Sequence, residues 1–460
     1  MLPVVIIGGG ISGLSTAYYL AKAGIPSTLV ERRNRLGGVI ETERLHGCVI
    51  ETGPDSFLSQ KPWAMDLIRD LGLADQVIGS NDHLRVTYVW KGRRLVPLPD
   101  GLMLMIPTRV LPMITTRLLG WRTKIRMGLE WFRRPDENKP GDRSVADFVT
   151  DHYGREAVDY LAEPLLAGIY GGDPGKLSVS SVLPRFVELE RKYGSLTRGV
   201  LAARRQRTNS ESKGLPLFQT LKGGLSQLTE ALVAAAGPAL RVVQAEAETL
   251  EREAGGFRIR LGAQWLEAAQ VVLACQAYEA GALLSETDPE LSALLHSVSY
   301  SSSVTISLGY DRSSLGHRLN GFGFLVPKCE RRRLVACTWL GTKFSHRVPD
   351  HMAVLRCFVG GEDDGAVGES DEALAAAVQE ELSEIMGVTA EPVFTRIARW
   401  PRSMAQYSVG HAERVARIAG RLRQIPGLFL AGNAYHGIGV PDCIRMGKEA
   451  ARRITSLRRA

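Results

Sequence analysis

The N-terminal segment carries a pattern of apolar and polar positions that predicts a βαβ unit. The aliphatic run Val4–Ile7 predicts a buried strand, and the glycine-rich stretch 8–14, GGGISGL, follows it directly. Residues 15–21 predict a helix, and a second strand at 27–30 ends on Glu31. Strand, glycine turn, helix, strand and acidic residue in this order are typical of a dinucleotide-binding fold.

The glycines of this unit have separate roles in the predicted site. Gly8 makes the tight turn, Gly10 lets the backbone approach a pyrophosphate, and Gly13 lets the helix pack close to the strand. The Glu31 carboxylate can accept both ribose hydroxyls. A lone glycine motif also occurs in ordinary turns, but the complete set predicts a bound adenine dinucleotide. The expected contacts are Gly8, Gly9, Gly10, Ile11, Ser12, Gly13 and Glu31.

A second glycine pair follows in the segment 32–40, RRNRLGGVI. The segment resembles the flavin-dependent amine oxidase superfamily, in which this loop runs along the FAD phosphates. Arg35 could neutralise phosphate charge, although a glycine-rich hairpin with a solvated arginine is the alternative. The position of Glu31 argues against NADP, and the whole pattern favours FAD over NAD. The expected contacts in this loop are Arg32, Arg35, Gly37 and Gly38.

The C-terminal part of the chain predicts the other end of the same site. A buried strand at 428–430 leads into glycines, and Pro441 marks the start of a helix to about Leu457. The N-terminus of that helix could face the flavin pyrimidine edge, where negative charge develops on reduction. An ordinary strand, loop and helix is the alternative. The expected FAD contacts here are Gly432, Asn433, Gly439, Val440 and Ile444.

The middle of the chain predicts two further parts. Residues 102–134 mix Leu, Met, Ile and Trp with Arg and Lys and predict short amphipathic helices. These helices form a self-contained helical subdomain, a lid over a substrate channel, or a face that touches a membrane. Residues 304–358 alternate apolar and polar side chains and predict an antiparallel sheet, the natural floor of a substrate cavity. Other predicted elements are a hairpin at 87–97, helices at 63–73, 145–149 and 225–236, strands at 240–243, 257–261 and 271–274, and a mobile loop at 204–214.

The predicted fold class is therefore α/β, with a discontinuous Rossmann-like FAD domain, an antiparallel-sheet substrate domain and a helical lid or membrane-type subdomain. The 460 residues are too many for one simple core. The expected domains are 1–80, 215–290 and 400–460 for FAD binding, 81–98 and 291–399 for substrate binding, and 99–214 for the lid.

Composition narrows the class of protein. No apolar run is long enough to span a bilayer, and we expect no signal peptide, because the first apolar residues already belong to the nucleotide-site strand. The six cysteines lack C-x-x-C spacing, which argues against a metal site or a disulfide framework and fits a cytoplasmic protein. The net charge of +8 can keep the protein soluble, attract an acidic substrate or attract an anionic membrane surface. The positive residues are dispersed along the chain, which argues against nucleic-acid binding.

Several segments together resemble the bacterial porphyrinogen oxidases of haem biosynthesis. The GPDSFL sequence in the segment 51–62 is similar to the branch that acts on coproporphyrinogen III and also accepts protoporphyrinogen IX. The segments are GGGISGL at 8–14, ERRNRLGGVIET at 31–42, ETGPDSFLSQKP at 51–62, PLLAGIYGGDPGKLS at 164–178, LKGGL at 221–225, GFGFLVP at 321–327, RCFVGG at 356–361, RWPRSMAQYSVGH at 399–411 and LAGNAYHGIGVPDCI at 430–444.

The resemblance implies a reaction in which a porphyrinogen loses hydride from a meso carbon to flavin N5 and then a pyrrole proton. Oxygen takes the electrons and forms hydrogen peroxide. The 399–411 segment has no cysteine, so we expect non-covalent FAD. The implied partners are a porphyrinogen, oxygen, a transiently bound ferrochelatase and the inner face of the membrane. The alternatives are a flavin-dependent amine oxidase and a flavin-binding scaffold without enzyme activity.

The resemblance also assigns roles to residues. Lys61 corresponds to a position that meets a propionate, with a surface lysine as the alternative. Gly168 and Ile169 line the pocket, and the Gly168 carbonyl, near the pyrrole nitrogens or the meso carbon, is the catalytic candidate. Three residues match sheet positions that sandwich the macrocycle and are otherwise plain core: Leu325, Trp339 and Phe358. Trp339 stands where some relatives carry Leu. Gly53, Pro54 and Trp400 complete the expected flavin contacts.

Overall fold

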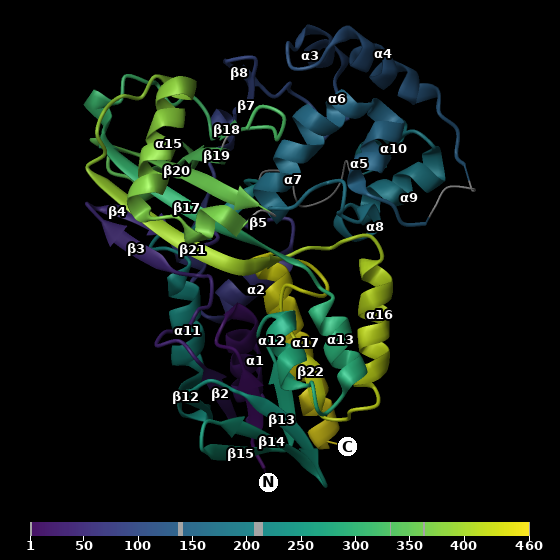
Figure 1. Ribbon diagram of the computed structural model, residues 1–460, viewed down its shortest axis with the longest axis vertical. Helices are drawn as coiled ribbons and strands as arrows, with labels where there is room; N and C mark the ends of the chain where they lie inside the picture. Colours follow the sequence, from purple (N-terminus) through teal and green to yellow (C-terminus); the bar gives the residue numbers. More distant parts are fainter. Residues whose placement is uncertain (1, 137–140, 207–214, 332, 362–363, 460) are drawn as a thin grey trace. The chain divides into compact units, whose positions relative to one another are not determined.

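A computed structural model describes residues 2–136, 141–206, 215–331, 333–361 and 364–459 of the chain. The chain forms two compact units, each assembled from segments that are far apart in the sequence (Figure 1). Unit 1 contains Met1–Ser80, Pro216–Ser299 and Glu413–Ala460, and unit 2 contains Asn81–Leu215 and Tyr300–Ala412.

Unit 1 is built on a five-stranded parallel sheet in the order β12-β2-β1-β16-β22. Its central strand β1 is buried along its whole length, as expected of a parallel strand covered on both faces. Helix α1 packs against α17, and the Thr16 hydroxyl donates to the Gly447 carbonyl at 3.3 Å. Figure 1 shows this meeting of the purple N-terminal and yellow C-terminal segments. The bounds are β1 Val4–Ile7, β2 Ser27–Glu31, β12 Leu240–Gln244, β16 Gln270–Leu273, β22 Leu428–Leu430, α1 Ile11–Lys22 and α17 Val440–Arg459.

Smaller elements complete unit 1. Unit 1 also contains two three-stranded antiparallel sheets, β5-β11-β6 and β13-β14-β15, and the hairpin β3-β4. Their bounds are β3 Thr42–Leu45, β4 Cys48–Glu51, β5 Phe57–Leu58, β6 Val77–Gly79, β11 Phe218–Leu221, β13 Thr249–Glu253, β14 Gly256–Leu261 and β15 Gln264–Ala268. The helices are α2 Pro62–Asp70, η1 Ala74–Gln76, α11 Ser226–Ala236, η5 Gly237–Ala239, α12 Ala277–Leu283, α13 Pro289–His296 and most of α16 His411–Leu422.

Unit 2 is built on a seven-stranded sheet in the order β21-β17-β20-β19-β18-β7-β8, antiparallel except between β7 and β18. Alternate residues of these strands form a core with helix α15; examples are Ile306, Leu355, Leu374 and Val378. The alternation in 304–358 therefore predicted the sheet correctly. The bounds are β7 Thr87–Lys91, β8 Arg94–Pro97, β17 Tyr300–Asp311, β18 Gly323–Leu325, β19 Leu334–Trp339, β20 Met352–Gly361, β21 Phe394–Ala405 and α15 Asp371–Met386.

A helical part of unit 2 has its own core, which includes Phe148 and Leu161. Ser144 caps α5, accepting a hydrogen bond from the Asp147 amide at 3.0 Å. The elements are β9 Leu102–Met103, β10 Ile106–Pro107, α3 Val110–Thr115, α4 Trp121–Leu129, η3 Glu130–Phe132, α5 Val145–Tyr153, α6 Arg155–Ala157, the π-helical η4 Val158–Ala162, α7 Glu163–Tyr170, α8 Val179–Val182, α9 Pro184–Tyr193 and α10 Leu196–Gln206. The shorter pieces of unit 2 are η2 Asp82–Leu84, η6 Arg312–Ser314, α14 Leu340–Lys343, η7 Ser345–Arg347 and η8 Asp364–Gly368.

The structure corrects some of the predicted elements. Residues 102–107 form a short hairpin instead of a helix, because β9 and β10 pair directly. Residues 204–206 belong to the last turn of α10, and the rest of the predicted loop, 207–214, lies outside the described residues. The segment 99–214 falls within unit 2, together with the large sheet; its role as a separate lid stays a prediction. Among the described helices, none combines the length and the hydrophobicity needed to cross a bilayer.

Candidate functional site

The glycine turn of unit 1 forms a backbone cradle at the start of α1. Gly8 has a φ of +110°, which favours glycine. A Cβ on Gly13 would lie 2.0 Å from the Gly8 carbonyl oxygen, so only glycine lets the helix begin directly over the strand. A Cβ on Gly10, in contrast, would meet its nearest neighbour, Gly38, at 3.9 Å. The cradle is closed where helix and strand meet and open at Gly10, as a pyrophosphate requires.

The second glycine pair packs directly on this cradle. The Gly37 amide donates to the Gly9 carbonyl at 2.8 Å, and a Cβ on Gly38 would lie 3.0 Å from the Gly10 Cα. Gly53 approaches the same loop, because its Cβ would lie 1.8 Å from the Val39 carbonyl oxygen. Two segments expected to contact the cofactor therefore come together at the cradle through backbone contacts.

Glu31 lies at the end of β2 with both carboxylate oxygens turned to backbone amides. Its Oε2 accepts from the Gly9 amide at 2.7 Å and its Oε1 from the Arg33 amide at 2.9 Å. A carboxylate offers about four acceptor positions, so these two bonds orient the group and leave capacity for hydroxyl donors. The geometry fits the predicted ribose contact.

The two predicted arginines are engaged with protein carboxylates. Arg32 pairs with Glu279 at 2.7 Å, and Arg35 pairs with Glu41 at 3.1 Å. Arg35 also donates to the Gly38 carbonyl at 2.8 Å, so it braces the second glycine pair. A phosphate contact of Arg35 stays a prediction.

The C-terminal end of the predicted site also reaches the cradle. Helix α17 lies against α1 so closely that a Cβ on Gly447 would be 2.4 Å from the Ser12 carbonyl oxygen. Of the predicted contacts in this segment, Ile444 is fully buried, so its side chain belongs to the core that α17 covers. Gly447 belongs to the second turn of α17, and the Cys443 side chain in the first turn hydrogen-bonds with Ser12. The first two turns of α17 therefore lie beside the start of α1. The N-terminal and C-terminal segments of unit 1 thus come together, and their residues fit one bound dinucleotide.

Lys61 has a partner that the sequence analysis missed. It precedes α2 as its N-cap residue, and its ammonium pairs with the Asp442 carboxylate in the first turn of α17. The Asp442 side chain is 5% exposed and the Lys61 side chain 38% exposed. The residue expected to meet a propionate thus already meets a buried carboxylate. Asp442 belongs to the PDCI segment, which was its one signal in the sequence.

Three of the predicted substrate residues come together in unit 2. Leu325 is in register with Ala336, which is in register with Phe358, so Leu325 and Phe358 share one face of the sheet. Helix α7 crosses this face, and a Cβ on Gly168 would contact Leu325 at 3.7 Å. The Arg356 guanidinium lies 4.7 Å from the centre of the Phe358 ring and supports it from the same strand.

Helix α7 is fixed at both ends. At its start, the buried Glu163 pairs with Arg331 at 2.6 Å. At its end, Gln406 donates to the Tyr170 carbonyl at 2.7 Å. A π-helical segment, η4, precedes α7; such segments are frequent at functional sites. Ile169, which follows Gly168 in α7, is 47% exposed.

Trp339 is not brought together with these residues. It is in register with Leu355, whose side chain belongs to the core under α15, and it is 1% exposed. Its ring packs 5.7 Å from Tyr88 and 5.2 Å from His317. The preceding residue, Thr338, occupies the face of Phe358, because neighbouring strand residues point to opposite faces. Trp400 belongs to unit 2, opposite Ser303 on β17.

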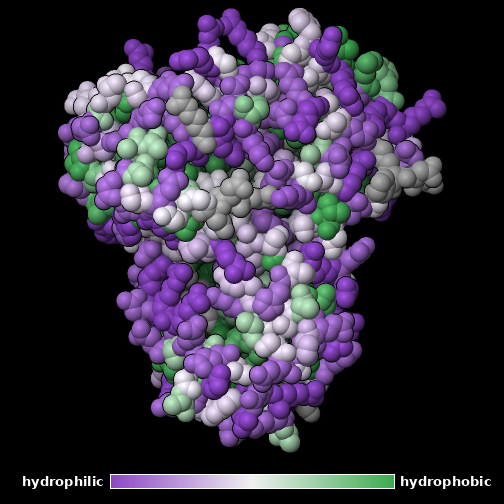
Figure 2. Space-filling view, viewed as in Figure 1, coloured by the Kyte–Doolittle hydropathy of each residue, from purple (hydrophilic) through white to green (hydrophobic). Residues whose placement is uncertain are grey.

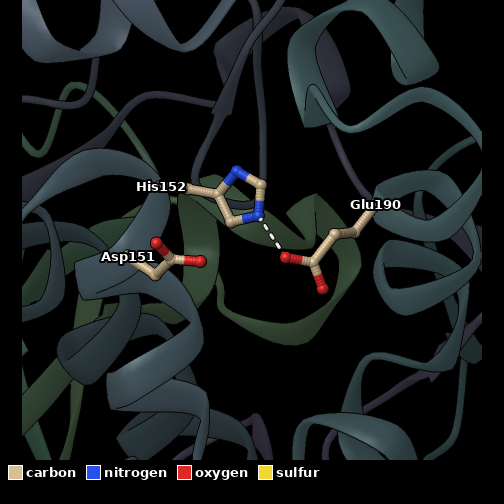
Figure 3. Close-up of side chains that lie close together, drawn as sticks. All are labelled: Asp151, His152 and Glu190. Atoms are coloured by element: carbon tan, nitrogen blue, oxygen red, sulfur yellow. Dashed lines mark hydrogen bonds and ion pairs between the residues drawn. The ribbon is translucent and has the colours of Figure 1, made fainter. Parts of the chain in front are cut away.

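A buried polar network in the helical part of unit 2 has the composition of a metal site. The atoms of Asp151, His152 and Glu190 that could coordinate a metal lie within 4.8 Å of one another (Figure 3). However, both imidazole nitrogens of His152 already face carboxylates, Nε2 at 2.9 Å from Glu190 and Nδ1 at 3.0 Å from Glu130. Arg133 pairs with Asp151 at 2.7 Å. The cluster is therefore a satisfied ion-pair network.

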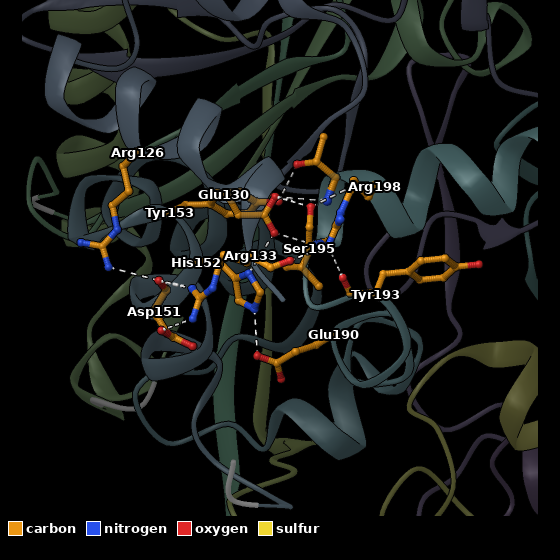
Figure 4. A network of polar contacts seen from close by, with 12 residues as sticks. Arg126, Glu130, Arg133, Asp151, His152, Tyr153, Glu190, Tyr193, Ser195 and Arg198 are labelled. Atoms are coloured by element: carbon orange, nitrogen blue, oxygen red, sulfur yellow. Dashed lines mark hydrogen bonds and ion pairs between the residues drawn. The ribbon is translucent and has the colours of Figure 1, made fainter. Parts of the chain in front are cut away.

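Glu130 is the centre of that network (Figure 4). It accepts from the Ser195 hydroxyl at 2.9 Å and the Leu196 amide at 2.6 Å. Burial raises the pKa of Glu130, but hydrogen bonds from His152, Leu196 and Thr197 outweigh it, and the pKa lies below its usual range. The network joins η3, α5, α9 and the start of α10.

Comparison with known proteins identifies the class. The family model for flavin containing amine oxidoreductases matches residues 11–455, and the chain belongs to this family. A flavin is thus the cofactor class of the protein. Solved structures of amine oxidases share the fold; cyclohexylamine oxidase from Brevibacterium oxydans IH-35A has a TM-score of 0.69 at 17% identity over 100% of both chains.

Relatives with higher sequence identity to this chain have more specific names. The chain is 35% identical to the coproporphyrinogen III oxidase of Bacillus subtilis, over 97% of this chain and 96% of the relative. It is 32% identical to the enzyme of that name from Staphylococcus aureus, over 98% of both. A solved structure of a protein assigned as a protoporphyrinogen oxidase from Exiguobacterium sp. 255-15 has a TM-score of 0.88 at 32% identity, over 99% of both chains.

Proposed function

We propose that this protein oxidises a porphyrinogen to the corresponding porphyrin with bound FAD. Coproporphyrinogen III is the principal substrate and protoporphyrinogen IX the second. The observation that carries the proposal is the face of the unit 2 sheet at Leu325 and Phe358, crossed by α7 at Gly168. The names of the full-length relatives support the same substrate class.

The chemistry of this face suits a large hydrocarbon macrocycle. Leu325 and Phe358 offer apolar surface, and Gly168 adds no side chain that would keep the macrocycle from the backbone. The Gly168 carbonyl is among the last four of α7, which lack partners within the helix, so it can accept a pyrrole N–H. The negative end of the helix dipole also favours the positive charge left on the macrocycle when hydride departs.

FAD is the proposed flavin because the cradle has the parts that an adenine dinucleotide needs. Gly10 is open to the pyrophosphate and Glu31 is oriented for the ribose. When bound, FAD accepts the hydride at N5, and oxygen takes the electrons and leaves as hydrogen peroxide. Chromatography of the flavin released by heat separates FAD from FMN.

An aerobic assay tests the activity. Purified protein is given coproporphyrinogen III, protoporphyrinogen IX or a panel of primary amines, and porphyrin fluorescence and hydrogen peroxide are followed together. We expect fluorescence and peroxide with both porphyrinogens, with faster turnover of coproporphyrinogen III. Peroxide from amines without porphyrin formation would replace the proposal by an amine oxidase. Turnover of protoporphyrinogen IX alone would overturn the substrate order.

Transient contact with a ferrochelatase and a cytoplasmic location remain predictions.

A second proposed property is peripheral contact with an anionic bilayer. The helical part of unit 2 exposes large apolar side chains, and Figure 2 shows hydrophobic residues gathered over α3 and α4. Val110 and Phe132 are each 74% exposed, and Trp121 is 70% exposed. Exposed arginines alternate with them, so apolar insertion and charge attraction would act together. The apolar set is Val110, Leu111, Ile114, Trp121, Ile125, Leu129, Trp131 and Phe132.

Flotation with vesicles tests the bilayer contact. We expect the protein to float with vesicles that contain phosphatidylglycerol at low salt and to be released at high salt. The double change Leu111→Ser and Phe132→Ser should abolish flotation, whereas Trp265→Ser, which removes a 44% exposed tryptophan from unit 1, should not. Equal flotation of all three proteins would exclude this surface.

A further inference from the structure

We propose that Lys61 and Asp442 form a charge pair that sets the reduction potential of the bound flavin. Lys61 would then act on the cofactor, in addition to any contact with a substrate carboxylate. The inference rests on the proposed FAD site, and it adds a role that neither the resemblance nor the comparisons assign to Asp442.

The Asp442 carboxylate is rigidly held. It belongs to the first turn of α17, a helix of 20 residues, and its Oδ2 accepts from the Gly439 amide at 3.2 Å. The loop before the helix wraps around it: Gly437 has a φ of +121°, and a Cβ there would lie 2.4 Å from the Asp442 Cγ. Because the side chain is 5% exposed, its charge is poorly solvated and acts on its surroundings.

This carboxylate lies close to the dinucleotide cradle. The same helix packs on α1, where Gly447 meets the Ser12 backbone and the Thr16 hydroxyl donates to the Gly447 carbonyl. Ser12 belongs to the glycine motif expected to bind the pyrophosphate. Cys443, the residue after Asp442, also hydrogen-bonds with Ser12 through its side chain, so the first turn of α17 lies beside this motif and can act electrostatically on the cofactor.

The charges of the pair decide the field at this point. A helix N-terminus carries about half a positive charge, which favours the negative charge that a flavin gains on reduction. An unpaired aspartate in the first turn would outweigh that half charge. The Lys61 ammonium neutralises Asp442, so the helix end stays net positive. Removing the lysine therefore makes reduction harder, and removing the aspartate makes it easier.

Neighbouring cations provide a matched control. Arg445, one turn along α17, donates to the His436 carbonyl at 2.7 Å and stacks 4.9 Å from the Trp63 ring centre. Lys448 lies on the exposed side of the same helix, 5.0 Å from the Tyr19 ring centre. Lys448→Met removes one positive charge from α17 without touching the pair.

The test is the midpoint potential of the bound flavin, measured anaerobically by dye equilibration on holoenzyme without substrate. We expect Lys61→Met to weaken the binding of reduced relative to oxidised flavin about tenfold, which lowers the potential by about 30 mV for a two-electron couple. Asp442→Asn should raise the potential, and the double variant Lys61→Met with Asp442→Asn should return close to the wild-type value. Lys448→Met and the charge-conserving Lys61→Arg should leave it near wild type.

The outcomes are distinct from those of the activity assay. An unchanged potential in Lys61→Met, or shifts of the same sign in both single variants, would overturn the inference. If Asp442→Asn does not retain flavin, Lys61→Met compared with Lys61→Arg still decides it. Opposite shifts in a protein that turns over no porphyrinogen would support the charge pair and reject the proposed substrate.

Discussion

The cradle of unit 1 and the sheet face of unit 2 are built from different materials. The cradle consists of backbone, and its shape depends on positions such as Gly13, where a Cβ would collide with a carbonyl oxygen at 2.0 Å. The sheet face consists of side chains, Leu325 and Phe358, that neighbouring strands bring into register. At such a position a backbone site tolerates no added atom, whereas a side-chain site should lose affinity in graded steps.

The variant expected to have the largest effect is Gly13→Ala in the cradle. Because the new methyl group would overlap the Gly8 carbonyl, α1 must move away from β1, and we expect the protein to lose its flavin completely or to fail to fold. The control is Gly420→Ala in α16 of the same unit, where the nearest atom is an arginine side-chain nitrogen 3.6 Å away. That change should retain flavin and gain up to about 1 kcal/mol of helix stability. Flavin absorbance per protein after gel filtration measures both, and full occupancy in Gly13→Ala would refute the cradle.

The two faces of the unit 2 sheet give the next largest effect. Trp339 is core, so Trp339→Ala should cost roughly 3–5 kcal/mol of unfolding free energy. Phe358 lies on the opposite face, and Phe358→Ala should raise the KM for porphyrinogen while unfolding free energy falls less. Denaturant unfolding and steady-state kinetics on both variants separate the two roles. A larger KM effect in Trp339→Ala than in Phe358→Ala would place Trp339 on the substrate face.

These cases show why part of the site could be predicted from the sequence and part could not. The cradle depends on local constraints: a strand, glycines with fixed spacing, and Glu31 at the next strand end. The hairpin at 87–97 and the alternation after residue 304 are local patterns of the same kind. The face of Trp339 depends instead on the register between β19 and β20, where a shift of one residue exchanges the two faces.

Charge pairs were missed for a related reason. Lys61 and Asp442 are 381 residues apart, and no local pattern joins them. The Glu130, His152 and Glu190 network likewise joins three separate helical elements, and each residue alone resembles an ordinary helix side chain. Such pairs form only after the helices have packed, so tertiary structure supplies what sequence periodicity cannot.

A smaller effect tests the ribose contact of the cradle. Glu31→Ala removes two charged hydrogen-bond acceptors from backbone amides and from the expected ribose hydroxyls. We expect FAD affinity to fall by on the order of 2 kcal/mol, about thirtyfold, so that the protein loses flavin on dialysis. Glu246→Ala is the control, because Glu246 is 70% exposed and lies 4.0 Å from Arg32. Equal flavin retention by the two variants would count against the ribose role.

Acid gives the smallest expected effect and should separate the two units. Among the described residues, the carboxylates whose pKa lies below its usual range are concentrated in unit 2; they are Glu130, Asp142, Glu156 and Asp173, with Glu449 on the exposed side of α17 in unit 1. For Glu130, burial opposes ionisation and the hydrogen bonds from His152 and Leu196 favour it more strongly. A lowered pKa contributes stability that is present above the unfolded value, near 4.3 for Glu, and is lost as pH falls through the folded value.

Unit 2 should therefore lose stability first below about pH 4.3, and Glu130→Gln should remove part of that acid sensitivity. We expect the variant to be less stable than wild type at pH 7, and the difference in Tm between the two proteins should shrink on acidification. Each kcal/mol corresponds to about 2–4 °C for a unit of this size. Glu449→Gln is the matched control, since its partner Arg452 lies on the same exposed side of α17 and surface pairs contribute little. A Tm difference for Glu130→Gln that stays constant from pH 7 to pH 3 would show that the network does not draw its stability from the ionised carboxylate.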